Sequence, residues 1–282
     1  MDMHGENIAC LLCGASETAP WGSENGWTAV KCSNCGLVYV NPRPREVEIS
    51  KANELGEHRT EAGVLRVVYS RDAHKLEYYR KVFVRLFADL LAKDEPVRWL
   101  DVGAGFGEVV EVLQALLPRG SVLEGIEPMR AKATNAQQRG LPITSRLLSE
   151  LPDRYHVISL INVFSHLSDP RAFLGEVDDH LLPRGEVFIE TGNGGDLNNA
   201  NEFPGPLYLP DHLQFAGESH LEQFLRDTGF AVLAKHRQRT DTLRVAIHWA
   251  AQWARGCPAK LRLPYTSPFR TILYRARTER VA

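Results

Sequence analysis

Residues 99–107 constrain the fold of this chain more than any other stretch, because they join a buried strand to a glycine turn. They read WLDVGAGFG, in which a short apolar run precedes three alternating glycines, Gly103, Gly105 and Gly107. The apolar run predicts a strand covered on both faces. Residues 108–117 continue with apolar positions at helical spacing. A strand, a glycine turn and a helix in succession let a ligand lie against bare backbone beside a helix N-terminus.

Asp101 restricts which ligand this turn can hold. It precedes the first glycine in the pattern D-x-G-x-G-x-G, where its charge would repel a pyrophosphate. A ligand that carries a cation or hydroxyls suits it better. The pattern resembles motif I of the class I S-adenosylmethionine (SAM) methyltransferases, in which the loop holds the amino-acid end of the cofactor. The resemblance implies that Asp101, Gly103 and Gly105 bind SAM. A nucleotide site and a plain tight turn are the alternatives.

A second acid, Glu127, ends the next predicted strand, residues 121–127. An acid about twenty residues beyond a glycine loop, at a strand end, suits bidentate hydrogen bonding to ribose hydroxyls. Pro128 follows at the first position of a helix predicted to end at Arg139. We therefore expect Glu127 to bind the ribose and Pro128 or Met129 to contact the adenine.

Two later segments complete the predicted cofactor site. Residues 143–148 predict a third strand, and the resembled family offers backbone to the adenine where this chain has Leu147 and Leu148. The next apolar strand ends at Asn162. We include Asn162 among the cofactor-binding residues.

Residues 155–170 carry the first candidate catalytic histidine. They read YHVISLINVFSHLSDP and resemble the family stretch F-D-x-I-x-x-x-x-V-x-E-H-x-x-D-P. This chain has His156 in place of the Asp and Ser165 in place of the Glu, but it keeps His166. In relatives this histidine lies near the methyl donor, which implies a catalytic role for His166. A capping or packing role is the alternative.

The second candidate, His212, follows a long loop at residues 192–210. The loop is rich in Gly, Asn and Pro and comes after a predicted strand, where open α/β sheets bind substrates. Imidazole titrates near neutral pH, so we predict that His212 is the general base. The alternative is that it only bonds a loop carbonyl. Its orienting partner is one of four residues: Asp211, Glu190, Asn193 or His166.

The segment around His212 also bears on the substrate. P-x-H-L-x-F, then a helix and G-F, resembles the same methyltransferases, which include deoxysugar C-methyltransferases. Those enzymes carry H-E-H where this chain has Pro210, Asp211 and His212. The departure favours another acceptor.

Four of the five cysteines form two C-x-x-C-G knuckles near the N-terminus. The knuckle spacing sets two sulfurs on one side of a turn, and thiols are reduced in the cytosol. We predict a closed structural zinc site made by Cys10, Cys13, Cys32 and Cys35. The run C-x-x-C-G-L-V-Y-x-N-P-R-P resembles the N-terminal segment of the same methyltransferase group.

The predicted fold is α/β, with a doubly wound, mostly parallel sheet and a small zinc ribbon. We expect the ribbon at residues 1–45, a linker and lid helix at 46–95, and the SAM-binding domain at 96–282. The linker is polar over 46–58 and the lid helix spans 62–92, with Tyr69 or Tyr78 facing either the pocket or the core. The tail predicts a helix over 243–253 and a strand near 271–274, or a helical hairpin.

Composition narrows the function. A net charge of −2 and a pI near 6.6 argue against a nucleic-acid surface. No apolar run could span a bilayer and no signal-peptide pattern is seen, so we expect a cytoplasmic protein that binds no membrane. Oligomeric state is not indicated.

These features together predict a SAM-dependent methyltransferase that acts on a small hydroxylated metabolite or saccharide, through O-methylation. C-methylation of a nucleotide-linked deoxysugar is the second reading, and RNA methylation through the ribbon is the third. A non-catalytic binding protein is a fourth, against which Asp101, Glu127 and the intact glycines argue.

Overall fold

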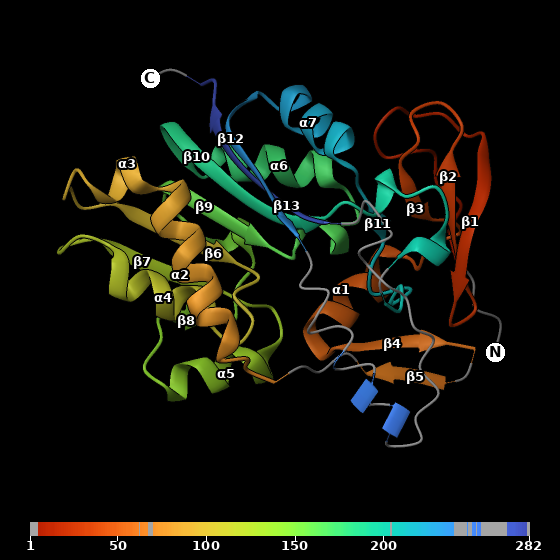
Figure 1. The fold of residues 1–282 in the computed structure, drawn as a ribbon, viewed down its shortest axis with the longest axis horizontal. Helices are drawn as coiled ribbons and strands as arrows, with labels where there is room; N and C mark the ends of the chain where they lie inside the picture. The colour runs from red at the N-terminus through yellow and green to blue at the C-terminus, as the bar shows by residue number, and fades with distance from the viewer. Residues whose placement is uncertain are drawn as a thin grey trace.

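The computed structural model describes residues 5–61, 63–66, 70–203, 205–239 and 270–280, with a few isolated positions between 247 and 254. The described chain forms a seven-stranded sheet with helices on both faces, and beside it a four-stranded sheet that contains the N-terminal strands (Figure 1). A two-stranded sheet lies below the second of these in the same view.

The large sheet is parallel except for one strand. In spatial order it contains β12 (Phe230–Arg239), β13 (Arg270–Thr278), β10 (Leu181–Gly192), β9 (Tyr155–Ile161), β6 (Arg98–Val102), β7 (Val122–Ile126) and β8 (Ile143–Thr144). Only β13 runs against its neighbours. The strand order reverses between β6 and β9, which creates a crevice at their carboxyl ends. The predicted doubly wound, mostly parallel sheet is confirmed.

Helices cover both faces of this sheet because successive residues of each strand point to opposite sides. The helices are α2 (His74–Leu86), α3 (Ala88–Leu91) and α4 (Glu108–Leu116) on one face, α6 (Pro170–Asp179) and α7 (Glu218–Asp227) on the other, and α5 (Arg130–Gln138) beside β8 (Figure 1). In β6, Trp99 packs against Phe83 and Phe87 of the first face, with ring centroids 5.5 and 4.8 Å away. Its neighbour Leu100 joins the cluster that contains Phe224 of α7. Among the described residues, no helix is long and apolar enough to cross a bilayer.

The N-terminal sheet takes a strand from a distant part of the chain. It contains β1 (Thr18–Glu24), β2 (Trp27–Cys32), β3 (Val38–Val40) and β11 (Gln214–Phe215), and Phe215 pairs with Val38. Three of these strands come from the predicted ribbon, but the sheet is completed by residues just after His212. The ribbon is therefore joined through the backbone to the segment that carries the candidate base.

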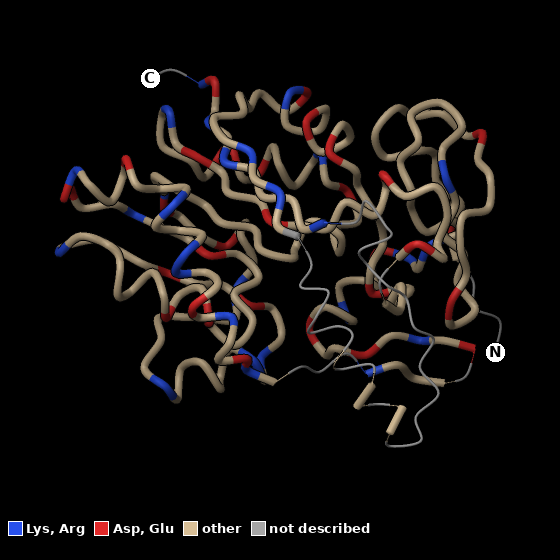
Figure 2. The backbone as a smooth tube through the Cα atoms, in the orientation of Figure 1, with Lys and Arg blue, Asp and Glu red and all other residues tan. Residues whose placement is uncertain are grey.

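Charge is balanced along this ribbon. Its residues 5–45 carry three acids (Glu6, Glu17 and Glu24) and three bases (Lys31, Arg43 and Arg45). Figure 2 shows acidic and basic positions interspersed along the rest of the described chain as well.

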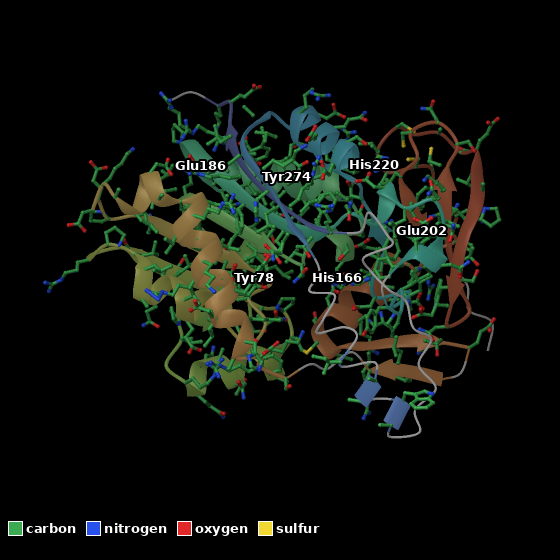
Figure 3. All side chains as sticks on the ribbon, in the orientation of Figure 1. Tyr78, His166, Glu186, Glu202, His220 and Tyr274 are labelled. Carbon is green, nitrogen blue, oxygen red and sulfur yellow. The ribbon has the colours of Figure 1, made fainter. Side chains whose placement is uncertain are left out.

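Polar contacts fix the ribbon to the second face of the large sheet. His220, near the start of α7, lies toward the ribbon in Figure 3, and its Nε2 is 2.8 Å from the Cys35 carbonyl oxygen. The Arg171 guanidinium of α6 donates to the Leu12 carbonyl oxygen at 3.0 Å. These contacts place both cysteine knuckles against α6 and α7.

The segment between ribbon and sheet differs from the prediction. The polar stretch predicted as a linker forms α1 (Glu46–Leu55) and β4 (Glu57–Thr60). The predicted lid helix begins only at His74, because β5 (Gly63–Arg66) pairs with β4 in an antiparallel hairpin. Only Ile49 and Ala52 of α1 are buried, so its helical periodicity is faint in the sequence.

Smaller differences concern element ends. The third strand, predicted over residues 143–148, stops at Thr144. The helix α5 begins at Arg130, two residues after the proline that we expected to start it. The predicted C-terminal strand is confirmed by β13, while most of the helix predicted over 243–253 lies outside the described residues, as does Tyr69.

Candidate active site

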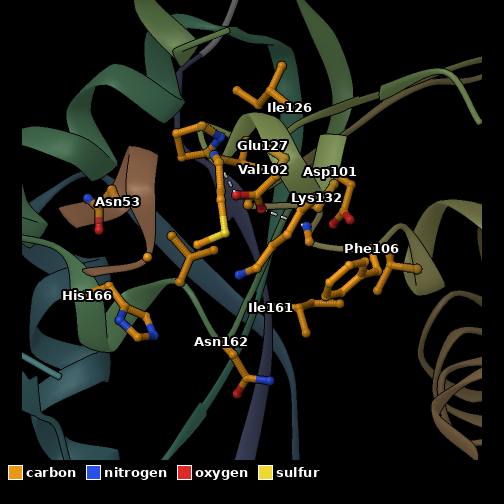
Figure 4. Close-up of a pocket in the computed structure, with 18 of the residues that line it drawn as sticks. Asn53, Asp101, Val102, Phe106, Ile126, Glu127, Lys132, Ile161, Asn162 and His166 are labelled. Atoms are coloured by element: carbon orange, nitrogen blue, oxygen red, sulfur yellow. Dashed lines mark hydrogen bonds between the residues drawn. The ribbon is translucent and has the colours of Figure 1, made fainter. Parts of the chain in front are cut away.

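A cavity of about 510 Å³ opens where β6, β7 and β9 end (Figure 4). Its volume lies within the range typical of small-molecule sites. The crevice where the strand order reverses therefore contains a cavity. Its lining includes every residue that the sequence predicts for cofactor binding: Asp101, Gly103, Gly105, Glu127, Pro128, Met129, Leu147, Leu148 and Asn162.

The glycine turn can lie close to a ligand because its three glycines carry no side chains. Gly103, Gly105 and Gly107 all have positive φ, between +55° and +85°. A Cβ at Gly103 would stand 2.5 Å from a methyl of Val163. No atom lies within 4 Å of a Cβ built at Gly105, so this position presents open backbone at the cavity.

Glu127 joins the turn to the start of the next helix. Its Oε2 accepts from the Gly105 N–H at 2.8 Å and its Oε1 from the Met129 N–H at 2.9 Å (dashed in Figure 4). The side chain is buried and lines the cavity. A carboxylate has about four acceptor sites, so two remain for hydroxyl donors of a ligand. Glu127 therefore fits the ribose-binding role predicted for it.

Asp101 is held by a buried chain of hydrogen bonds. The Ser159 hydroxyl donates to its Oδ1 at 2.5 Å, and the Trp99 indole N–H donates to the same hydroxyl at 3.0 Å. Burial, together with the charges of Glu127 and Glu108, outweighs the Ser159 bond and raises the pKa of Asp101 to about 7. A cation placed in the cavity would favour the ionised carboxylate. This arrangement fits a positively charged ligand.

Several lining residues were missed by the sequence reasoning. The helix α1 contributes Ala52 and Asn53, and Gly56 follows at its C-terminal end. Three cations come from elsewhere: Lys75, Lys132 and Arg146. Figure 4 shows Asn53 on the opposite side of the cavity from Asp101. No local pattern points to α1, because only the tertiary fold brings this polar segment over the sheet.

The two candidate catalytic histidines lie together at the cavity. The ring centroids of His166 and His212 are 5.0 Å apart, and both residues line the cavity with Asp211. Figure 3 shows His166 between the seven-stranded sheet and the four-stranded N-terminal sheet. His212 Nδ1 is 2.9 Å from the Leu207 carbonyl oxygen, so it donates there and leaves Nε2 as the acceptor of the neutral ring.

The orienting partner of His212 is none of the four predicted residues but the Leu207 carbonyl. The Asp211 carboxylate instead bonds His58, at 2.9 Å, and lies 3.4 Å from His166 Nδ1. Glu190 accepts from the Tyr78 hydroxyl at 3.3 Å, and burial raises its pKa to about 7. Tyr78 is only partly buried, and its hydroxyl bonds Glu190 at the end of β10.

The four N-terminal cysteines are drawn together as predicted. Cys10 and Cys35 have sulfurs 3.4 Å apart, those of Cys13 and Cys32 are 3.6 Å apart, and all four lie within 4.8 Å of one another. Zn–S bonds of about 2.3 Å in a tetrahedron place sulfurs about 3.8 Å apart. The donor set and its spacing therefore fit a tetrahedral zinc ion.

Comparison with known proteins bears on this cavity. A family described as a methyltransferase domain matches residues 72–235, more than half of the chain. Ubiquinone biosynthesis O-methyltransferases are related by sequence. The one from Stutzerimonas stutzeri (strain A1501) is 27% identical over 151 residues, 47% of this chain and 64% of that protein. The one from Parvibaculum lavamentivorans is 28% identical over 185 residues, 60% of this chain and 73% of that protein. The chain thus spans just under two thirds of the first relative.

Solved structures agree on the fold alone. Coclaurine N-methyltransferase bound to N-methylheliamine and SAH superposes with a TM-score of 0.53 at 12% identity, over 74% of this chain and 76% of that one. The cyclopropane synthase MmaA2 from Mycobacterium tuberculosis gives a TM-score of 0.50 at 15% identity, over 67% of this chain and 82% of that one.

Proposed function

Because the chain belongs to the class I SAM-dependent methyltransferases, we propose that it transfers the methyl group of SAM to a hydroxyl oxygen of a small molecule. The observation that carries the proposal is the pairing of two features in one cavity. Two buried acids beside a glycine turn form one side, and a histidine pair forms the other.

The cofactor side is assigned to residues at the ends of β6, β7 and β9. Glu127 would hold the ribose hydroxyls and Asp101 the cationic amino-acid end, while Met129 and Leu148 would enclose the adenine. SAM, when bound, supplies a methyl group on a sulfonium that an acceptor oxygen displaces in line. The residues of the chain align donor and acceptor, which can be worth about 7–11 kcal/mol of the barrier.

The acceptor side is assigned to the histidine pair. A hydroxyl must lose its proton as the methyl arrives, and a nearby neutral imidazole can accept it. The sequence relatives are named O-methyltransferases, which supports oxygen as the acceptor atom. If the substrate is a saccharide, the acceptor oxygen is a sugar hydroxyl and the same chemistry applies.

The C-methylation and RNA readings receive less support. The segment Pro210–His212 departs from the H-E-H of sugar C-methyltransferases. The ribbon lacks the excess of Lys and Arg that a nucleic-acid surface needs, with three bases against three acids in residues 5–45.

We also propose that the four cysteines bind one structural zinc ion. Four thiolate ligands leave no open position for catalysis. The ion would fix the knuckles, and through β3 and β11 it would help to place the segment that contains His212.

The test is calorimetry followed by a methyl-transfer screen. Saturable binding of SAM and of its demethylated product is expected, without binding of NAD or ATP. Incubation with tritiated-methyl SAM and a panel of phenols, catechols and nucleotide-linked sugars should label at least one hydroxyl, as identified by mass spectrometry. Label on a carbon atom, or in RNA only, would move the function to the corresponding alternative. Binding of neither SAM nor its product would reject the proposal.

A further inference from the structure

Asp211 lies between two histidines from different parts of the chain. On one side its Oδ1 is 2.9 Å from Nε2 of His58, a buried residue of β4 in the segment predicted to be a linker. On the other side it is 3.4 Å from Nδ1 of His166, which also lies 2.9 Å from the Asp211 carbonyl oxygen. His166 and Asp211 line the cavity, and His58 stands behind them.

The hydrogen bonds fix which nitrogen of each ring carries a proton. His58 and His166 outweigh the effect of burial and hold the pKa of Asp211 well below its usual range, so the carboxylate is ionised and only accepts. His58 must then donate from Nε2, and His166 must donate from Nδ1. In the neutral His166 ring, Nε2 is left as the acceptor, on the side of a residue that lines the cavity. The Nδ1–H of His166 therefore donates to the Asp211 carbonyl oxygen at 2.9 Å, and the ionised carboxylate lies beside it at 3.4 Å, where its charge favours the protonated ring.

In the part of the chain that the structure describes, no carboxylate is hydrogen-bonded to His212, although that of Asp211 lies nearby. Its Nδ1 donates to a neutral carbonyl, and its ring packs edge-on against Phe215 at 5.8 Å between centroids. Burial and the charge of His166 lower the pKa of His212 to about 4, despite a raising effect from Asp211. For His166, burial lowers the pKa and Lys132 adds to this, but the charge and hydrogen bonds of Asp211 outweigh both and raise it. Two titratable groups with separated pKa values indicate distinct roles.

We propose that His166 is the base that accepts the acceptor's hydroxyl proton, with Asp211 and His58 as positioning residues and His212 as a neutral hydrogen-bonding partner. The proposal rests on the proposed function and moves the role of general base from His212, for which the sequence predicted it, to His166. In the step, the C–S bond of the sulfonium breaks and its electron pair stays on sulfur. The O–CH₃ bond forms, and the hydroxyl proton moves to Nε2 of His166, which releases it to water after the products leave.

The first test needs no methyl acceptor. Protein labelled with ¹⁵N in its histidines and saturated with the demethylated product of SAM is titrated by NMR between pH 5 and 9. Variants His166→Gln and His212→Gln assign the two rings, and His74→Gln, at an exposed position, is the matched control. We expect His166 as the Nδ1–H tautomer with the higher pKa, and His212 neutral throughout. Asp211→Asn should lower the pKa of His166, because it removes the negative charge beside the ring.

The opposite titration order, with His212 protonated first, would overturn the proposal whatever the function of the protein. So would a divalent metal held at this cluster, because ligand atoms of His166, Asp211 and His212 lie within 4.8 Å of one another. Metal analysis that finds a second ion per chain, lost in His166→Gln, is therefore a refuting result.

The second test uses the acceptor found in the methyl-transfer screen, at saturating SAM. His166→Gln should lower kcat by about 10²–10⁴-fold with unchanged SAM affinity, and His212→Gln should lower it by less than about tenfold while raising KM for the acceptor. In Asp211→Asn the acid limb of the pH profile should move to lower pH, a shift that a merely structural role would not produce. A larger loss of kcat in His212→Gln than in His166→Gln contradicts the assignment.

Discussion

Replacing Glu127 with alanine tests the cofactor side of the cavity. The carboxylate accepts two backbone N–H groups, from Gly105 at 2.8 Å and from Met129 at 2.9 Å. Removing it leaves both donors without this acceptor, at a cost of about 1–3 kcal/mol each when a buried group stays unsatisfied. Because the site faces the cavity, water can reach the freed donors. We therefore expect the lower end of the sum, about 2 kcal/mol of unfolding free energy.

The effect on cofactor binding is separate. Hydrogen bonds from ribose hydroxyls to a charged acceptor are worth about 1.5–3 kcal/mol. Since each 1.4 kcal/mol is tenfold in affinity, Glu127→Ala should weaken SAM binding by about 10–150-fold. Loss of the turn's geometry would add to this figure, so it is a minimum.

Two measurements on the same protein separate the loss of stability from the loss of SAM affinity. Urea denaturation gives the unfolding free energy, and calorimetry gives the Kd for SAM and for its demethylated product. Glu77→Ala is the matched control, because Glu77 is exposed on α2 and pairs with Lys81 in an i,i+4 salt bridge worth about 0.5 kcal/mol at most. Unchanged SAM affinity in a folded Glu127→Ala protein would refute the assignment of Glu127 to the ribose.

Three further predictions follow from other parts of the structure. Burial raises the pKa of Asp101 to about 7, so the contribution of its protonated form to stability is present at low pH and is lost as the pH rises through 7. SAM affinity should instead fall below pH 7, because the carboxylate takes up a proton there. Asp101→Asn should remove both pH dependences, as measured by denaturation and by calorimetry. Zinc removal or Cys10→Ser should lower turnover more than SAM affinity, because β11 comes just after His212 and pairs with the ribbon. Metal analysis would confirm the loss of zinc, and a larger loss of SAM affinity than of turnover would contradict the prediction. Phe83→Ala should cost about 3–5 kcal/mol in urea denaturation, because its fully buried ring contacts Trp99 and Phe188; a cost below about 1 kcal/mol would contradict this packing.

Local patterns were enough to predict which residues line one side of the cavity. The glycine turn, Asp101 before it and Glu127 at the next strand end all lie within 27 residues, so short sequence spacings are enough to identify them. The same holds for the cysteine knuckles, whose two-residue gaps dictate that the sulfurs share a side. In the structure the glycine turn and both acids line one cavity, and the four sulfurs lie within 4.8 Å of one another.

The acceptor side depends on contacts that spacing does not encode. His58 and Asp211 are 153 positions apart, yet their side chains meet at 2.9 Å. The helix α1 reads as a polar linker, since only two of its ten residues are buried, and it covers the cavity because the ribbon and β4 carry it there. Adjacent in sequence, Asp211 and His212 point to different partners.

The sequence by itself therefore determined the family, the parallel sheet, the two acids that line the cavity and the cysteine cluster, all of which follow from residue types at short intervals. Only the tertiary structure decided which carboxylate stands behind which histidine and that β11 completes the ribbon. The physical reason is that a hydrogen bond depends on the position and direction of two atoms. When those atoms belong to distant segments, their relation is fixed by how the sheets and helices pack, and no local pattern in the chain records it.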